Sequence, residues 1–115
     1  MSAQPASLLT DEELLSAVRD GDQRAFGDLW RRHSRAGMRA AHSFKHLGEP
    51  ADLVSEAFTR IFTVLQRGSG PTGAFRPYLY TTIRNISLRN VHHLAAATNV
   101  EIDFDTVVAP ETVAD

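Results

Sequence analysis

Apolar residues recur at three- and four-residue steps along most of this chain, which is the spacing of one face of an α-helix. From Gln23 to about Lys45 the stripe comprises Phe26, Leu29, Trp30, His33, Gly37, Ala40, Ala41 and Phe44. From Pro50 to about Gln66 it comprises Leu53, Val54, Ala57, Phe58, Ile61, Phe62 and Leu65. A last stripe starts near Ala74 and consists of Phe75, Leu79, Ile83 and Ile86. No hairpin signal competes with these runs, so the sequence predicts an all-α fold, a compact three- to four-helix bundle.

Local signals set the ends of these helices. Thr10 and Glu13 have the spacing of a capping box, which opens a short helix that carries Leu14, Leu15 and Val18. Gly21 is expected to close that helix, and Asp22 to cap the next one. Pro50 suits the first turn of the third helix. The segment Arg67–Gly73 is rich in glycine and is predicted to be a loop. The fourth helix is expected to reach His92 or Leu94.

The chain has 115 residues, of which 43% are hydrophobic, enough for one modest core. We expect a flexible N-terminus over residues 1–9 and a helical domain over residues 10–97. Residues 98–115 carry a net charge of −5 and show no helical period. They are predicted to be an acidic linker that leads to a further domain.

Composition argues against several functions. The chain has no cysteine, so neither a disulfide framework nor a thiolate metal site is expected. No apolar run approaches the length of a membrane span, and the N-terminus lacks the pattern of a signal peptide. We expect a cytoplasmic location and no membrane contact. No P-loop, G-x-S-x-G or H-E-x-x-H motif occurs, which predicts a protein without enzymatic activity or cofactor.

Two pairs of histidines have spacings that deserve a test against metal binding. His42 and His46 stand four apart, a spacing that can chelate zinc on one helix. No carboxylate or thiol lies nearby in the sequence to complete the site. We therefore predict surface or core histidines and no metal, and we expect the same of His92 and His93.

Charge is segregated along the chain. Residues 22–46 and residues 67–97 each carry a net charge of +4, although the whole chain carries −2. Within the second block, residues 75–90 combine arginines and aromatic residues and contain no acidic residue. A basic helix with aromatic faces, entered from a glycine-rich loop, suits a nucleic-acid backbone whose bases are unstacked. The sequence thus predicts single-stranded or melting DNA as a partner.

Three motifs, in this order and spacing, resemble region 2 of extracytoplasmic-function sigma factors of the sigma-70 family. They are GDQRAFGDLWRRH at 21–33, ADLVSEAFTRIF at 51–62 and FRPYLYTTIRN at 75–85. The likeness covers roughly residues 10–94. It implies the helical fold of sigma region 2 and a role in bacterial transcription initiation, with core RNA polymerase and the promoter −10 element as partners. The domain that reads the −35 element (region 4) is then expected beyond the acidic linker.

The resemblance assigns the third helix to the β′ clamp coiled coil of the polymerase. The family pattern falls on Asp52, Leu53, Val54, Glu56 and Phe58, with Arg60 one turn further. The alternative is that the apolar members are core residues. We assign Val54 and Phe58 to the core. Polymerase binding is predicted for Asp52, Leu53, Glu56 and Arg60.

The resemblance assigns the −10 element, on the non-template strand, to the fourth helix and to the loop before it. In the loop, Arg67, Ser69 and Gly70 are expected to surround a flipped base; the alternative is a plain flexible connector. On the helix, Asn85 is expected to contact a base and Tyr80 to stack on one. Arg76, Arg84 and Arg89 are expected to neutralise phosphates. The alternatives are an Asn85 bonded to its own backbone and solvated arginines. Tyr78 is expected to be a core residue.

The sequence also departs from the family. Thr81 stands where the family often has arginine, and Asn90–Ala95 replaces a run of arginines. Fewer fixed charges predict weak binding of isolated DNA. Two alternative functions stay open at this stage. One is an interaction module seen mainly as the target of an anti-sigma factor. The other is a standalone helix-turn-helix type regulator that reads duplex DNA.

Overall fold

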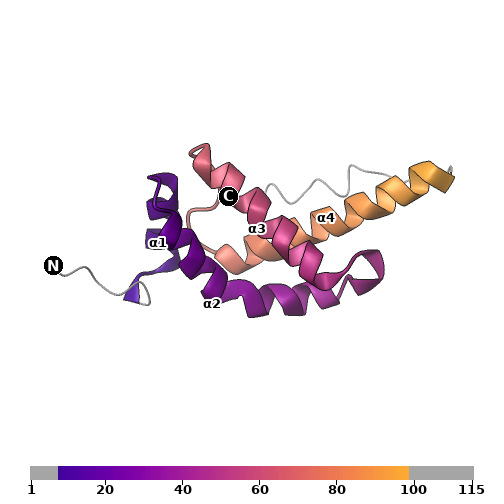
Figure 1. Cartoon of the computed structure of the whole chain (residues 1–115), viewed down its shortest axis with the longest axis horizontal. Helices are drawn as coiled ribbons and strands as arrows, with labels where there is room; N and C mark the ends of the chain where they lie inside the picture. Colours follow the sequence, from indigo (N-terminus) through magenta and orange to yellow (C-terminus); the bar gives the residue numbers. More distant parts are fainter. Residues whose placement is uncertain (1–7, 99–115) are drawn as a thin grey trace.

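The computed structural model describes residues 8–98, and side chains as far as Val91. Within that part the chain forms α1 (Asp11–Arg19), α2 (Gln23–His42), the short 3-10 helix η2 (Lys45–Leu47), α3 (Pro50–Gln66) and α4 (Phe75–Thr98). In Figure 1, α2 runs along the bottom of the bundle and α3 crosses α4 above it. Helix α2 packs against the other three, and α3 packs against α4. The predicted all-α bundle is confirmed.

The helix ends follow the capping signals. The Thr10 side chain accepts a hydrogen bond from the Glu13 N–H, and the Thr10 N–H donates to the Glu13 carboxylate at 2.8 Å. The Asp22 carboxylate accepts from the Arg24 N–H at 3.0 Å. Gly21 turns the chain between α1 and α2 with a φ of 104°, a conformation that favours glycine. Each cap satisfies backbone N–H groups that the helix itself leaves without partners.

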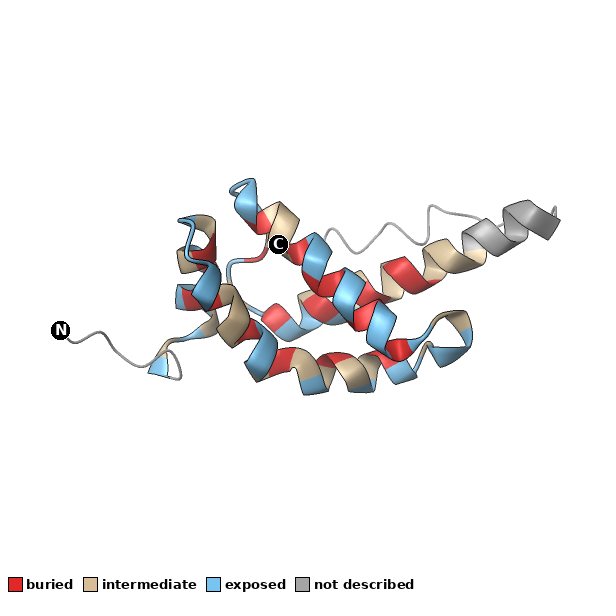
Figure 2. Cartoon of the chain, in the orientation of Figure 1, coloured by how far each residue is buried: buried red, intermediate tan, exposed pale blue. Residues whose placement is uncertain are grey.

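The core lies where α1, α2, α3 and α4 meet (Figure 2). The predicted stripe of α4, namely Phe75, Leu79, Ile83 and Ile86, is 0–1% exposed. The α3 stripe is buried as well, apart from the half-buried Phe62. The stripe of α2 needs a correction at Trp30, which is 40% exposed. Its ring packs edge-on against Phe58 of α3 at 4.7 Å between centroids, so the indole is partly covered and partly exposed.

Two helix ends differ from the prediction. Helix α2 ends at His42 rather than near Lys45. The N–H groups of Ser43 and Phe44 donate to the carbonyls three residues earlier, as in a 3-10 turn, rather than four residues earlier. The tightened turn leads into η2, whose Leu47 carbonyl accepts a hydrogen bond from Asn90 of α4 at 2.8 Å. Helix α4 continues to Thr98, past the predicted end at His92 or Leu94. Alanines at 95–97 favour helix, and no glycine or proline interrupts it.

Among residues 8–98, no helix is both long and apolar enough to cross a membrane. The predicted acidic linker, apart from its first residue, and most of the predicted flexible N-terminus lie outside the described residues.

Candidate nucleic-acid and protein-binding surfaces

The loop between α3 and α4 is fastened to α1. Arg19 donates from one terminal nitrogen to the Pro71 carbonyl at 2.9 Å and to the Ser69 carbonyl at 3.5 Å. Pro71 is buried, while Arg67 and Ser69 are exposed. These contacts hold the loop in one place and disfavour the alternative of a plain flexible connector.

Gly70 is required by the shape of this loop. Its φ of +98° lies in the left-handed region, and a Cβ there would lie 2.9 Å from Cδ2 of Leu65. A side chain at this position therefore meets both backbone strain and a close contact. Gly70 thus lets the loop pack on the end of α3, and its predicted place beside a flipped base stays a prediction.

The DNA-binding residues predicted on α4 divide into two rows. Tyr80 and Arg84 stand four apart, as do Asn85 and Arg89, so each pair follows one line along the helix. The Tyr80 ring lies 5.8 Å from the Phe44 ring, beside the end of α2. Arg89 pairs with Glu56 of α3 at 3.0 Å. The first row is thus turned toward α2 and the second toward α3.

The row of Tyr80 and Arg84 is open to a ligand. Tyr80 is 44% exposed. Arg84 is half-buried and has no ion pair or hydrogen bond within the described residues. An aromatic face beside an arginine that lacks an ion pair is an arrangement that stacks a base and neutralises its phosphate.

Asn85 carries an unpaired acceptor. Its side-chain oxygen is buried and has no hydrogen-bond partner in the part of the chain that the structure describes. The alternative in which Asn85 bonds to its own backbone is therefore not seen for this oxygen. A buried unpaired acceptor costs about 1–3 kcal/mol, and in native proteins such groups are uncommon.

The predicted polymerase-binding residues of α3 differ in their exposure to solvent. Asp52, Glu56 and Arg60 are exposed. The Glu56 carboxylate accepts from Arg60 at 3.1 Å and from Arg89 at 3.0 Å. Leu53 is only 3% exposed and lies in the core with Val54 and Phe58. The exposed face of α3 is therefore polar, and Leu53 supports it from inside rather than forming part of the surface.

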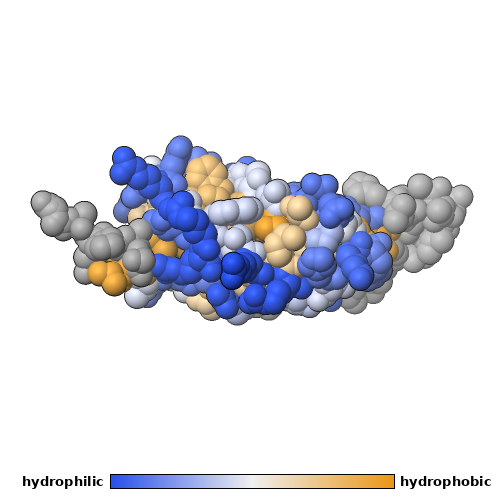
Figure 3. All heavy atoms as spheres, turned by 60° about the horizontal axis from the view of Figure 1, so that its bottom comes forward, coloured by the Kyte–Doolittle hydropathy of each residue, from blue (hydrophilic) through white to orange (hydrophobic). Residues whose placement is uncertain are grey.

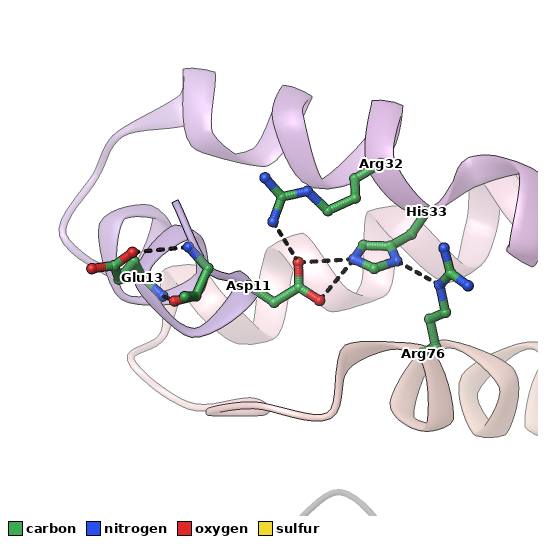
Figure 4. A network of polar contacts seen from close by, with 6 residues as sticks. Asp11, Glu13, Arg32, His33 and Arg76 are labelled. Carbon is green, nitrogen blue, oxygen red and sulfur yellow. Dashed lines mark hydrogen bonds and ion pairs between the residues drawn. The ribbon is translucent and has the colours of Figure 1, made fainter. Parts of the chain in front are cut away.

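Arg76 is held by a polar network that the sequence did not reveal (Figure 4). Its Nε donates to Nδ1 of His33 at 3.0 Å. The other ring nitrogen of His33, Nε2, lies 2.9 Å from both carboxylate oxygens of Asp11. Arg32 also pairs with Asp11 at 2.9 Å. Since Nδ1 accepts and Nε2 faces a carboxylate, these partners assign the ring proton to Nε2.

The network joins α1, α2 and α4 at one corner of the bundle. His33 is 4% exposed, and its ring packs 4.8 Å from that of Phe75. Burial alone would raise the pKa of Asp11, but the hydrogen bonds from His33 and Arg32 and the positive charge of Arg32 outweigh it and lower that pKa. Asp11 is thus held as a carboxylate.

No group of three histidine, cysteine or acidic side chains among residues 8–91 is arranged to hold a metal ion. His42 is the last residue of α2 and His46 lies in η2. The two histidines are therefore not one turn apart on a single helix, as the predicted zinc-chelating pair would be.

Several contacts were not predicted because their partners lie far apart in the chain, and three of them involve predicted functional residues. They are the network around His33, the tie from Arg19 to the loop, and the pair of Glu56 with Arg89. Only His33 gave a signal, as a polar residue on an otherwise apolar stripe. Comparison with known protein families, with characterised proteins and with solved structures finds no significant match.

Proposed function

We propose that this chain is a sigma-factor domain of the region 2 type, which binds core RNA polymerase and captures the melted −10 strand of a bacterial promoter. The observation that carries the proposal is the row of Tyr80 and Arg84, an exposed aromatic ring and an arginine without an ion pair. They lie on a helix with no acidic residue between Phe75 and Thr98. Such a row favours unstacked bases over a duplex surface. The proposal implies a cytoplasmic protein that acts in transcription initiation.

A second surface supports the same function. Asp52 and Glu56 are four residues apart on the exposed side of α3, where a partner helix can reach both. The polymerase contact on α3 and the DNA contact on α4 are then separate faces of one bundle. We expect substitutions on the DNA-binding face to leave polymerase binding intact, whereas Glu56, which pairs with Arg89 of α4, joins the two faces.

Binding to a β′ clamp coiled-coil fragment tests the polymerase contact. The double variant Asp52→Asn/Glu56→Gln is expected to lose binding, because it replaces both carboxylates at the proposed interface with neutral amides. Glu12→Gln/Asp20→Asn is the matched control, since it removes two negative charges from exposed side chains in α1 and at its C-cap. If the wild-type chain is folded and does not bind the fragment, the sigma-type assignment fails.

Promoter opening by reconstituted polymerase tests the DNA contact. Asn85→Ala is expected to reduce opening while the affinity for core polymerase stays unchanged. An equal loss of both activities would contradict the separation of the two faces. Arg84→Gln is expected to flatten the dependence of log K on log salt by about one unit, whatever the DNA sequence.

One observation favours a protein partner on a further face. Trp30 is 40% exposed, and its neighbours Phe26, Phe58 and Phe62 form a chain of ring contacts across α2 and α3. A half-exposed indole beside an aromatic cluster is typical of a contact anchor. This face suits the alternative in which the domain is the target of an anti-sigma factor. The helix-turn-helix alternative is less suited, because residues 67–74 form a longer connection than the three or four residues of that motif.

A further inference from the structure

Helix α1 holds the loop between α3 and α4 at two places. Arg19, at the end of α1, donates to the Pro71 carbonyl at 2.9 Å. Asp11, at the start of α1, faces His33, which accepts a hydrogen bond from Arg76 just past the loop. In Figure 1 the loop runs beside α1 before it enters α4. A helix to which no DNA contact is assigned therefore fixes the middle and the far end of a loop that is predicted to contact DNA.

Arg19 ties down the middle of the loop. The backbone of α3 holds the loop as far as Ser69, whose N–H donates to the Val64 carbonyl at 3.1 Å. Gly68 and Gly70 have φ angles of 85° and 98°, and a glycine backbone can adopt many other conformations. The guanidinium of Arg19 restricts that freedom, because it contacts the carbonyls of the residues before and after Gly70.

The contacts of Arg19 point to a positioning role. Arg19 is half-buried and has no acidic partner within residues 8–91. Its bond to the Pro71 carbonyl is partly buried, and a bond from a charged donor is stronger than one between neutral groups. Loss of this side chain is therefore expected to release the loop without breaking an ion pair.

We propose that Arg19 is a positioning residue for base selection: it fixes the shape of the loop, and the fixed loop discriminates between the bases of the captured strand. This inference rests on the proposed function and on the predicted contact of the strand with Arg67 and Ser69, both of which are exposed. Donors and acceptors distinguish base edges only where their positions are fixed. A released loop would adapt to each base and would lose similar ordering entropy for all of them.

Hydrogen exchange of the full chain, without DNA, tests whether Arg19 holds the loop. In Arg19→Gln the backbone amides of residues 69–74 are expected to exchange about tenfold faster than in the wild type, because the loop opens more often. Mass spectrometry of the peptides that cover the loop measures the rates. Circular dichroism checks that the variant is folded.

Arg35→Gln is the matched control, because it removes the same charge from a site with no assigned binding role. Arg35 is exposed and has no ion pair or hydrogen bond within residues 8–91. It stands two residues before Gly37, which faces Leu79 of α4, so it lies on the opposite side of α2. Figure 3, which brings the lower side of Figure 1 forward, shows a largely hydrophilic surface there. Exchange in the loop is expected to be unchanged in this variant.

Selection of single-stranded DNA by the full chain tests base discrimination. A pool with about ten random positions is bound at about 50 mM potassium chloride, and the bound strands are sequenced. Arg19→Gln is expected to lower the ratio between the most and the least favoured base by about fivefold or more at the positions that meet the loop. Selection elsewhere in the strand is expected to stay unchanged, whereas a general loss of structure would weaken it at every position. The dependence of log K on log salt is expected to keep its slope.

Several results would overturn the proposal. Unchanged exchange in Arg19→Gln would show that Arg19 does not hold the loop. Faster exchange with base discrimination intact would show that the shape of the loop does not set it. A slope that falls by about 0.7 would make Arg19 a phosphate contact instead, and equal effects of Arg19→Gln and Arg35→Gln would leave only net charge as the cause.

Failure of the proposed function looks different. If the folded wild-type chain selects no base, capture of the melted strand fails, and this inference fails with it. If the wild-type chain selects bases and Arg19→Gln selects them equally well, the inference alone fails and the proposed function is unaffected.

Discussion

Helix α4 holds Arg76 in its first turn and Arg89 in its second half, and the two arginines make different contacts. Arg76 donates to the buried His33, which in turn meets the carboxylate of Asp11. Arg89 pairs with Glu56, whose side chain is 46% exposed. The sequence predicted the same role, a phosphate contact, for both arginines. Arg76, although exposed, donates to the buried ring of His33, whereas Arg89 shares an exposed carboxylate with Arg60.

The difference concerns the energy that each arginine must give up before it binds DNA. An exposed ion pair contributes about 0–1 kcal/mol and weakens with salt, so Arg89 can exchange Glu56 for a phosphate at small cost. A hydrogen bond to a buried ring is harder to replace, because its loss leaves His33 without a donor in the core. Arg76 is therefore expected to keep its position and to offer a phosphate only the terminal nitrogens of its guanidinium.

The largest effect is expected from removal of the buried ring. His33→Ala deletes the packing against Phe75, leaves Arg76 without its partner and leaves Asp11 with Arg32 alone. We expect the free energy of unfolding to fall by about 2–4 kcal/mol, measured by urea denaturation. His42→Ala is the control, since His42 is exposed at the end of α2, and a change within about 0.5 kcal/mol is expected there. If the two variants lose similar amounts of unfolding free energy, the loss reflects any substitution in α2 and not the network around His33.

The next effect depends on pH. Asp11→Asn is expected to cost about 1–2 kcal/mol at neutral pH, because the charge-assisted bonds with His33 and Arg32 weaken. The pKa of Asp11 is lowered below 3.8 by those partners, against the effect of burial, which raises it. The stabilisation is therefore fully present above pH 3.8 and is lost as the pH falls through the lower, folded-state value.

Urea denaturation of both proteins as a function of pH measures this effect. The stability curves of wild type and Asp11→Asn are expected to lie apart at neutral pH and to converge in strong acid. Glu12→Gln removes a neighbouring exposed carboxylate and serves as the control, with a small difference expected at every pH. A gap between wild type and Asp11→Asn that persists in strong acid would mean that the carboxylate charge is not the source of the stability.

The sequence predicted the apolar stripe and the cap of the helices, but not the polar network that joins them. The stripe of Phe75, Leu79, Ile83 and Ile86 follows helical spacing, and its burial was predicted because periodicity is a local property. The capping box of Thr10 and Glu13 was predicted for the same reason. The network of Asp11, His33 and Arg76 spans 65 residues of sequence, and no local pattern relates its members.

The pairing of Glu56 with Arg89 was hidden in the same way. The sequence assigned these residues to different partners, a polymerase and a DNA strand, since each stands on its own helix. Only the crossing of α3 and α4 brings the two charges to 3.0 Å. The candidate faces were thus predictable from helical spacing, whereas the contacts that link them depend on how the helices pack.

A smaller effect is expected from the exposed pair itself. In a double-mutant cycle with Glu56→Gln and Arg89→Gln, we expect a coupling free energy of about 0.2–1 kcal/mol, which decreases when salt is added. Urea denaturation at low and high salt measures it. A coupling above 2 kcal/mol would make this pair as strong as the network around His33 and remove the contrast between Arg76 and Arg89.

The smallest expected effect is an increase in the affinity for single-stranded DNA. Glu56→Gln releases Arg89 from its carboxylate, so an affinity gain of about two- to threefold for a labelled single strand is expected at low salt, equivalent to roughly 0.5 kcal/mol. Asp52→Asn removes an equal charge one turn earlier on α3 without freeing an arginine, and it is expected to give a smaller gain. If the two variants raise the affinity equally, the gain reflects net charge alone. Arg89 would then be only a structural partner of Glu56 and not a phosphate-binding residue that Glu56 masks.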